Sequence, residues 1–373
     1  MSKKKGRSLI SSLLYPAPPA SYSENSFPDE LLWMPQNLNY ATCPPGGGIP
    51  GILLRCQHAK FLLMYLHSNA EDIGTARHFG CGMRMLLGMH VFLVEYPGYG
   101  IYAGESSEDA LEATADLAFR YLTKTLSWPA EDIIVMGRSL GASLATRLAC
   151  NYAFHGLVLV SPFLSLVEAV SEHLGAIAQL VLADEYRNKD LISRVQVPTL
   201  IIHALNDKLV PVRHGKELHQ LCPQKRKLLV CPQYMGHNGD ILRDANLLIH
   251  PMLRLFSLPD YSLTALQVPP EAFDKRLCVA YHAVFEAARE ASPLKRNFGD
   301  QGDGLEGGND MDGPRCIHQG HPQCDGDLAA DLTAMEQTGD VCDGDGLARV
   351  DTEPHVPVAI RTLRCNYSSL QFR

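Results

Sequence analysis

The sequence predicts an α/β fold in which a mostly parallel central sheet is covered by helices on both faces. Short, continuous apolar runs alternate along the chain with longer segments whose apolar residues recur at helical spacing. Strands that are continuously apolar are typical of parallel sheets buried on both faces. The chain has 373 residues, and its apolar periodicity extends from Leu53 to Ala288, so it is long enough to bury a large core.

The predicted elements alternate in chain order. Two adjacent strands, joined by a turn near His58, are predicted at residues 51–56 and 60–67. Further strands are predicted at residues 90–96, 132–137, 155–163, 197–205 and 226–232, and helices at 72–88, 106–126, 140–153, 213–222 and 269–291. In the helix at 106–126, Ser107 can cap the first turn. The residues that recur on its apolar face are Leu111, Ala115, Ala118 and Leu122.

The segment from about residue 163 to 195 carries no strand signal. We expect it to form a small helical cap over the carboxyl edge of the sheet, where open α/β sheets place their sites. The alternative is an ordinary crossover helix. On this basis the core domain covers residues 41–292.

Residues 1–40 form a basic, amphipathic and Pro-rich segment. If it is helical, Leu9, Ile10, Leu13 and Leu14 share one face, next to Lys3, Lys4, Lys5 and Arg7. This pattern predicts either weak peripheral contact with an anionic membrane surface or a frayed, solubilising terminus. The apolar stretch is too short and too interrupted for a signal peptide, and Ser2 replaces the glycine that myristoylation requires.

Residues 293–373 are predicted to be a disordered acidic tail. Between residues 299 and 354 the chain has 14 acidic residues against two arginines, and few residues there can be buried. Cys316, His318, His321 and Cys324 lie close together, but their spacing is not that of a standard zinc finger. We therefore expect neither a metal nor another cofactor.

The bulk composition excludes several classes of protein. No basic stripe with interleaved aromatic residues is present, so we expect no nucleic-acid partner. No apolar run reaches the length of about 20 residues that a membrane span needs. The 11 scattered cysteines contain no C-x-x-C pair, which indicates reduced thiols and a cytoplasmic protein, with peripheral membrane contact as a further possibility.

The strongest local motif is Gly137-Arg138-Ser139-Leu140-Gly141, between a predicted strand and a predicted helix. A turn this tight strains its central residue and leaves no room for a Cβ at Gly137 or Gly141. It also directs the Ser139 hydroxyl away from the sheet, which favours a nucleophile over a simple helix cap.

A serine nucleophile needs a base, and the base needs an acid that orients it. Asp207 and His237 each follow a predicted strand further along the chain. All three residues therefore fall at one edge of the sheet, in the order Ser, Asp, His. His214 and His219 lie on the helix after Asp207 and should face solvent, whereas His203, inside a strand, should be a packed or supporting residue.

The oxyanion of a tetrahedral intermediate needs backbone donors. Leu140 would supply one N–H. The second would come from the loop after residue 67, with Asn69 as the first choice and Ser68 as the second.

These motifs resemble the α/β-hydrolase superfamily from about Tyr15 to Phe256. The segments YLHSNAEDIG, VEYPGYG, GRSLG, SPF, TLIIHALNDKLVP and GHN occur in that superfamily's order, and the early LLYPAPPASYS and LLWMP are similar to the group of depalmitoylating domain-containing protein 17 enzymes and their Bem46-like relatives. The resemblance implies a serine hydrolase whose triad is Ser139, Asp207 and His237.

The chain departs from that group at several points. Ser68 stands at a position that is often glycine, Tyr102 stands where a serine is usual, and no cysteine precedes Cys43. Three functions therefore remain open: removal of fatty acyl groups from esters or thioesters, including lipidated proteins; a soluble carboxylesterase or serine peptidase for small substrates; and a non-enzymatic scaffold with the hydrolase fold.

Overall fold

The computed structural model describes residues 14–35, 48–175, 177–258 and 266–275, and these residues contain one eight-stranded sheet. Its strands are β1 (Leu31–Met34), β2 (Ile49–Leu54), β3 (Leu62–Leu66), β4 (His90–Val94), β5 (Ile133–Arg138), β6 (Gly156–Val160), β7 (Thr199–Ile202) and β8 (Lys227–Val230). They lie in the order β1-β2-β4-β3-β5-β6-β7-β8. The six strands from β3 to β8 are parallel to one another. Only β2 runs in the opposite direction, because it is antiparallel to both of its neighbours, β1 and β4. The predicted, mostly parallel sheet is confirmed.

One predicted strand pairing is wrong. The apolar runs at 51–56 and 60–67 were expected to be neighbours, but β2 pairs with β4, with Leu53 opposite Phe92, and β3 lies between β4 and β5. His58 does adopt a positive φ of 60° in the turn between them. Every residue of β3 is buried, and parallel strands pair with its backbone on both sides. These partners are distant in sequence, so the short turn between β2 and β3 does not reveal the pairing.

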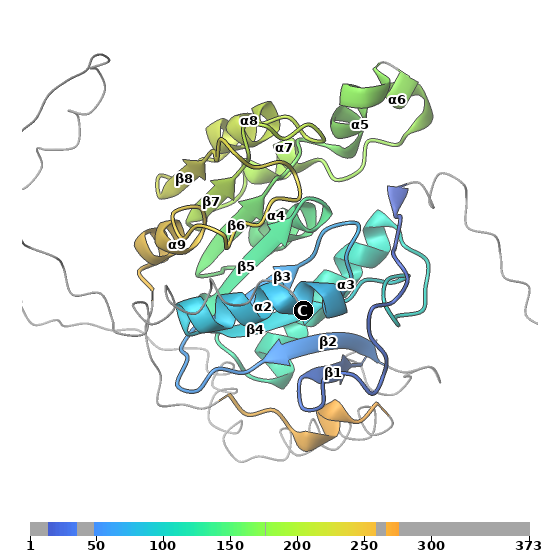
Figure 1. Ribbon diagram of the computed structural model, residues 1–373, viewed down its shortest axis with the longest axis vertical. Coiled ribbons are helices and arrows are strands. Elements are labelled where there is room, and N and C mark those ends of the chain that lie inside the picture. Colours follow the sequence, from blue (N-terminus) through green and yellow to red (C-terminus); the bar gives the residue numbers. More distant parts are fainter. Residues whose placement is uncertain (1–13, 36–47, 176, 259–265, 276–373) are drawn as a thin grey trace, which may run out of the picture. The chain divides into compact units, whose positions relative to one another are not determined.

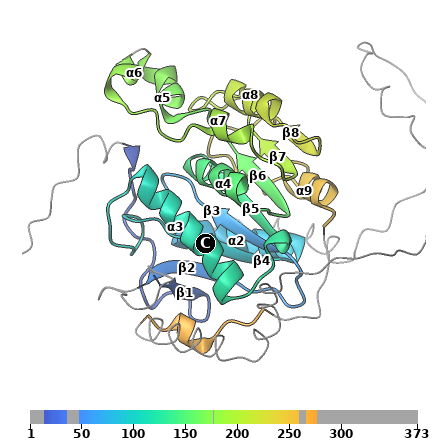
Figure 2. The same ribbon diagram turned by 180° about the vertical axis from the view of Figure 1, so that it is seen from behind.

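Helices cover both faces of the sheet, as Figures 1 and 2 show from opposite sides. Along β3, Leu62, Met64 and Leu66 belong to one core cluster, whereas Leu63 and Tyr65 belong to the other, because successive side chains of a strand point to opposite faces. One face carries α2 (Ile73–Leu87) and α9 (Ile249–Phe256). The other carries α3 (Glu108–Arg120), α4 (Leu140–Asn151) and α8 (Arg213–Leu221).

The helix α3 begins where its cap predicts. The Ser107 side chain accepts a hydrogen bond from the N–H of Ala110, and the predicted apolar face, including Leu111 and Ala115, is buried. The helix continues into a π-helical turn, η2 (Tyr121–Thr125). A 3-10 turn, η3 (Ala130–Asp132), then leads into β5.

The predicted cap is present between β6 and β7. Its described residues form three short helices, α5 (Leu166–Leu174), α6 (Ile177–Val181) and α7 (Asn188–Ile192). The buried Asn188 side chain donates to Ser143 Oγ on α4 at 2.7 Å, and so fixes the cap to the main domain. In Figure 1, α5 and α6 lie away from the central strands, whereas α7 lies beside α8.

Of the predicted terminal helix at 269–291, the described residues contain a 3-10 turn, η4 (Pro270–Phe273). Residues 1–13 and the acidic tail with its Cys/His cluster lie outside the described residues, so those expectations stay predictions. Within the described ranges, no helix combines the length and the apolar character needed to cross a bilayer.

The start of β6 lies very close to α9. A Cβ on Gly156 would be 2.1 Å from a ring carbon of the buried Phe256. We therefore expect Gly156→Ala to lower the free energy of unfolding by roughly 1–3 kcal/mol through overpacking. Chemical denaturation followed by circular dichroism measures this loss. In a Phe256→Leu background, the same glycine substitution should cost less, and an equal cost in both backgrounds would contradict this explanation.

Candidate active site

The structure brings Ser139, Asp207 and His237 together at the carboxyl ends of β5, β7 and β8. His237 Nε2 lies 3.0 Å from Ser139 Oγ, and His237 Nδ1 lies 2.7 Å from Asp207 Oδ2. The Asp207 side chain is fully buried and that of His237 is 8% exposed. Because a carboxylate only accepts, Nδ1 carries the proton that it shares with Asp207, which leaves Nε2 as an acceptor for the serine hydroxyl.

Ser139 lies in a strained turn between β5 and α4. Its φ is +52° and its ψ is −113°, a conformation that non-glycine residues rarely adopt. A Cβ on Gly137 would lie 2.1 Å from the Gly141 carbonyl oxygen, and a Cβ on Gly141 would lie 2.1 Å from that of Leu66. Both glycines are therefore required by close backbone contacts. The Ser139 side chain makes no capping hydrogen bond to α4, which removes the alternative of a helix cap.

The Asp207 carboxylate accepts hydrogen bonds from two backbone N–H groups in addition to its contact with His237. Its Oδ1 accepts from the N–H groups of Leu209 at 3.0 Å and Val210 at 2.9 Å. Burial raises the pKa of this carboxyl, but the hydrogen bonds from His237 and Val210 outweigh that effect and bring the pKa below its usual value of 3.8. The carboxylate is therefore ionised at neutral pH.

The loop that carries His237 is fixed by Arg138, the residue just before the serine. The Arg138 guanidinium donates from Nη2 to the main-chain oxygens of His237 at 3.0 Å and Gly239 at 2.9 Å. Sequence reasoning missed this role. The sequence did show a long cationic side chain, Arg138, inside the Gly-x-Ser-x-Gly motif. This motif lies at the sheet edge to which the His237 loop was also predicted to belong.

Three histidines outside the triad, His203, His214 and His219, differ in burial and in their contacts. His203 is fully buried, donates to the Val210 carbonyl at 2.7 Å and lies 3.6 Å from Asp207 Oδ2, so it supports the Asp207 loop, and burial lowers its pKa. The expectation that His214 faces solvent is wrong. His214 is fully buried, because its side of α8 packs against the cap and its Nδ1 accepts from the Leu164 N–H. His219 is half-buried.

Leu140 and Asn69, the preferred oxyanion positions, both lie beside Ser139 in the wall of one cavity. The Asn69 side chain is locked: its Nδ2 donates to the Leu14 carbonyl at 2.7 Å, and its Oδ1 accepts from the Tyr99 hydroxyl at 2.5 Å. The N–H of Ser68, the second choice, donates instead to Glu71 Oε2 at 3.0 Å. The geometry therefore favours Asn69 over Ser68, and the roles of Leu140 and Asn69 stay predictions.

The cavity beside Ser139 has a volume of about 480 Å³ and a predominantly apolar wall. The residues that line it from the cap, the N-terminal segment and the loop after Asp207 include Leu14, Tyr15, Phe163, Leu166, Ala169, Val170, Leu174, Leu182, Tyr186, Leu209 and Val210. The hydroxyls of Tyr15 and Tyr186, two of the lining residues, lie 3.0 Å apart. The N-terminal contribution was visible in the sequence only as part of the resemblance. Among the described residues, no group of three His, Cys, Asp or Glu side chains is arranged for a metal ion.

Comparison with known proteins finds curated relatives that match part of this chain. No family model matches the chain. It is 31% identical over 211 residues to alpha/beta hydrolase domain-containing protein aho-3 of Caenorhabditis elegans, covering 57% of this chain and 61% of that protein. It is 30% identical over 194 residues to alpha/beta hydrolase domain-containing protein 17B of Xenopus tropicalis, covering 52% and 66%. The chain therefore spans about three fifths of the length of the curated relatives it matches.

A solved structure agrees with the fold. The Pyrococcus furiosus esterase Pf2001 superposes with a TM-score of 0.52 at 13% identity, covering 65% of this chain and 97% of the esterase. At this identity the likeness concerns the fold alone. Taken with the eight-stranded sheet, it shows that the chain has the α/β-hydrolase fold, and its sequence is similar to those of α/β-hydrolase domain-containing proteins.

Proposed function

We propose that the protein is a serine hydrolase that cleaves acyl esters or thioesters through an acyl-enzyme intermediate. The observation that carries this proposal is the continuous contact from Asp207 through His237 to Ser139, at the wall of an apolar cavity. A scaffold has no need of this arrangement.

The proposed reaction begins with attack of Ser139 Oγ on the acyl carbonyl carbon while His237 Nε2 takes the hydroxyl proton. The carbonyl oxygen becomes an oxyanion, and the N–H groups of Leu140 and Asn69 would bind it. Collapse of this intermediate breaks the bond to the alcohol or thiol, which takes the proton from His237 as it leaves. Water, activated by the same histidine, then hydrolyses the acyl-enzyme and restores Ser139.

The cavity supports an apolar acyl group as the part of the substrate bound next to Ser139. Fatty acyl chains meet this requirement, and removal of such chains from protein cysteines is the more specific form of the proposal. It is supported by the apolar wall and by the relatives named domain-containing protein 17. A cytoplasmic location with peripheral membrane contact agrees with this substrate.

The nucleophile is tested with a fluorophosphonate probe, which reacts with activated serines. We expect the wild-type protein to be labelled and Ser139→Ala not to be, because the alanine has no oxygen to phosphonylate. Ser143→Ala, on α4 but bonded to Asn188, serves as the control and should still be labelled. Equal labelling of wild type and Ser139→Ala would contradict the proposal.

The role of the carboxylate is tested with Asp207→Asn. We expect kcat to fall by roughly 10⁴-fold with a smaller change in KM, because an amide no longer fixes the productive tautomer of His237. Asp240→Asn, an exposed carboxylate in the His237 loop, should leave kcat within about twofold. A similar loss in both variants would show that the effect is not specific to Asp207.

The same carboxylate gives a pH dependence with a definite sign. Because the pKa of Asp207 in the folded protein lies below its usual 3.8, its contribution to stability is present above pH 3.8. That contribution is lost as the pH falls through the lower, folded value. Acid unfolding of the Asp207→Asn variant should therefore lack this component, which a comparison of denaturation midpoints between pH 2 and pH 6 would measure.

The acyl cavity is tested with Ala169→Phe on α5, which places a ring in the space beside Ser139. We expect kcat/KM for long acyl esters and thioesters to fall at least tenfold relative to acetyl or butyryl substrates, since the ring removes the volume that a long chain occupies. Ala153→Phe, at an exposed position before β6, is the matched control. An unchanged chain-length profile would place the acyl group elsewhere, and the ratio of ester to thioester turnover would separate a thioesterase from a carboxylesterase.

A further inference from the structure

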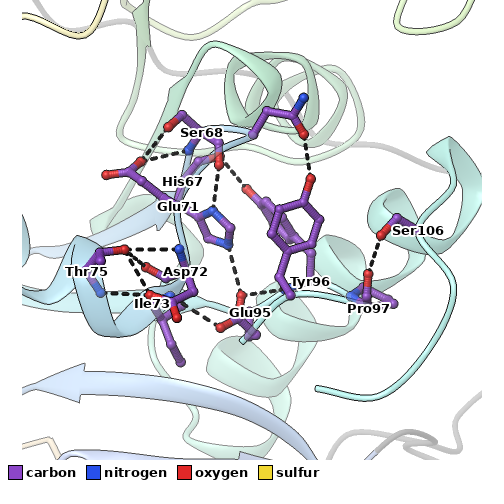
Figure 3. A network of polar contacts seen from close by, with 12 residues as sticks. His67, Ser68, Glu71, Asp72, Ile73, Thr75, Glu95, Tyr96, Pro97 and Ser106 are labelled. Atoms are coloured by element: carbon purple, nitrogen blue, oxygen red, sulfur yellow. Dashed lines mark hydrogen bonds and ion pairs between the residues drawn. The ribbon is translucent and has the colours of Figure 1, made fainter. Parts of the chain in front are cut away.

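A second histidine, His67, lies at the end of β3 and is not one of the triad residues. Its ring is buried and stacks on Tyr96 with ring centroids 4.0 Å apart. Both ring nitrogens face hydrogen-bond acceptors: Nδ1 lies 2.9 Å from the Ser68 carbonyl oxygen, and Nε2 lies 3.1 Å from Glu95 Oε1 (Figure 3). A neutral imidazole can donate from only one of its nitrogens.

The other contacts of Glu95 favour one arrangement of the protons in this pair. Besides His67, its Oε1 accepts from the Tyr96 N–H at 3.1 Å. Its Oε2 accepts from the Tyr22 hydroxyl at 2.8 Å and from the Ile73 N–H at 3.3 Å. Tyr22, Ile73 and Tyr96 therefore supply three donors to Glu95 that do not depend on the state of His67, and such donors favour the negatively charged form of a carboxylate. Ile73 is also the first residue of α2, and the positive end of that helix favours a negative charge.

With the charged form of Glu95 favoured and the Ser68 carbonyl able only to accept, the contacts favour a hydrogen on both nitrogens of His67. We propose that His67 is a buried imidazolium that positions the oxyanion hole, by fixing the Ser68–Asn69 peptide so that the Asn69 N–H points at the reacting carbonyl. It is a positioning residue, and the inference rests on the proposed hydrolase function.

The link from His67 to Asn69 is the geometry of one peptide bond. The carbonyl of Ser68 and the N–H of Asn69 belong to the same planar unit and, in a trans peptide, point in opposite directions. A hydrogen bond from His67 to the carbonyl therefore fixes the direction of the N–H. A charged donor on the oxygen also polarises the peptide, which makes its N–H a stronger donor to an oxyanion.

Further contacts hold the same loop. The Tyr96 hydroxyl donates to the His67 carbonyl at 3.0 Å, and the Tyr99 hydroxyl donates to Asn69 Oδ1 at 2.5 Å. Glu71 accepts from both the N–H and the hydroxyl of Ser68. The titratable groups near His67, from its own strand, the loop after β4, the start of α2 and the N-terminal segment, are Tyr65, Glu95, Tyr96, Tyr99, Glu71, Asp72 and Tyr22.

The groups around His67 determine whether its pKa is raised or lowered, and therefore at which end of the pH range its charge is lost. Burial alone would lower the pKa of His67, but the hydrogen bond and the charge of Glu95 outweigh burial and raise it above its usual 6.5. The contribution of the imidazolium is therefore complete below pH 6.5 and is lost as the pH rises through the raised, folded value. The oxyanion loop should fail at alkaline pH and not at acid pH.

The experiment combines kinetics of Glu95→Gln with nitrogen NMR of the histidine rings in the full-length protein. The amide keeps the size of Glu95 but removes its charge, so burial should dominate and His67 should become neutral. We expect kcat to fall about 10- to 100-fold, less than the roughly 10²- to 10³-fold cost of removing an oxyanion donor outright, because the donor stays present but is less well oriented. KM should change little, since neither residue lines the acyl cavity. The alkaline limb of the kcat profile should also move to lower pH.

His90→Gln is the matched control. His90 is buried on β4 next to β3, but at the opposite end of the strands, with Leu62 as its partner. Rates are expressed per folded molecule from circular dichroism. A purely structural role for Glu95 would lower the folded fraction and leave the pH profile in place, and that result would overturn the proposal.

The NMR measurement does not depend on whether the protein is enzymatically active. In wild-type protein, both nitrogens of His67 should report attached protons below pH 6.5, and a neutral ring there would overturn the inference. The signal is assigned by its change in Glu95→Gln or, if that variant does not fold, in Tyr96→Phe, which alters the ring stacked on His67. If the wild-type protein turns over no ester or thioester, the proposed function fails. If it does, but Glu95→Gln behaves as His90→Gln, only the inference fails.

Discussion

The site depends on one close backbone approach, where β5 turns into α4. Ser139 keeps its positive φ because the chain on either side of it packs too closely for a Cβ at position 137 or 141. Its N–H donates to the Val160 carbonyl of β6 at 2.8 Å, which ties the turn to the next strand. A strained residue of this kind costs of order 1–3 kcal/mol, and the surrounding sheet must impose it. This strained conformation places Ser139 Oγ at the first turn of α4, within reach of the loops after β7 and β8.

The other wall of the site depends on the N-terminal segment from residue 14 to 22. Four of its residues contact the elements around the oxyanion loop and the cap, namely Leu14, Tyr15, Ser21 and Tyr22. Leu14 accepts from the Asn69 side chain, and Ser21 donates through its N–H and its hydroxyl to Asp72, the residue that caps α2. This segment therefore belongs to the structure of the site, since it crosses from the start of α2 to the cap.

The fold class and the three strand-end loops were predictable because they depend on local patterns. An apolar run followed by a polar loop residue marks the carboxyl end of a strand, and parallel strands bring such ends to one edge. The pairing of β2 with β4, the burial of His214 and the contact of Arg138 with the His237 loop were not predictable. Each joins residues that are distant in sequence, and a polar residue type alone does not show that a partner will bury it. The helix α9 was not predicted, because it has only eight residues and contains a proline, Pro251, in its first turn.

Two histidine–carboxylate pairs lie near the same sheet edge, and their third contacts distinguish them. In the pair of His237 with Asp207, the second ring nitrogen faces the Ser139 hydroxyl, which can donate, so the imidazole can stay neutral and accept a proton. In the pair of His67 with Glu95, the second nitrogen faces a carbonyl, which can only accept, so together with a charged Glu95 the contacts favour a hydrogen on both ring nitrogens. The same two side-chain types thus give a proton acceptor in one loop and a fixed cation in another. A histidine next to a carboxylate does not by itself identify a catalytic base, and the atom on its far nitrogen decides the assignment.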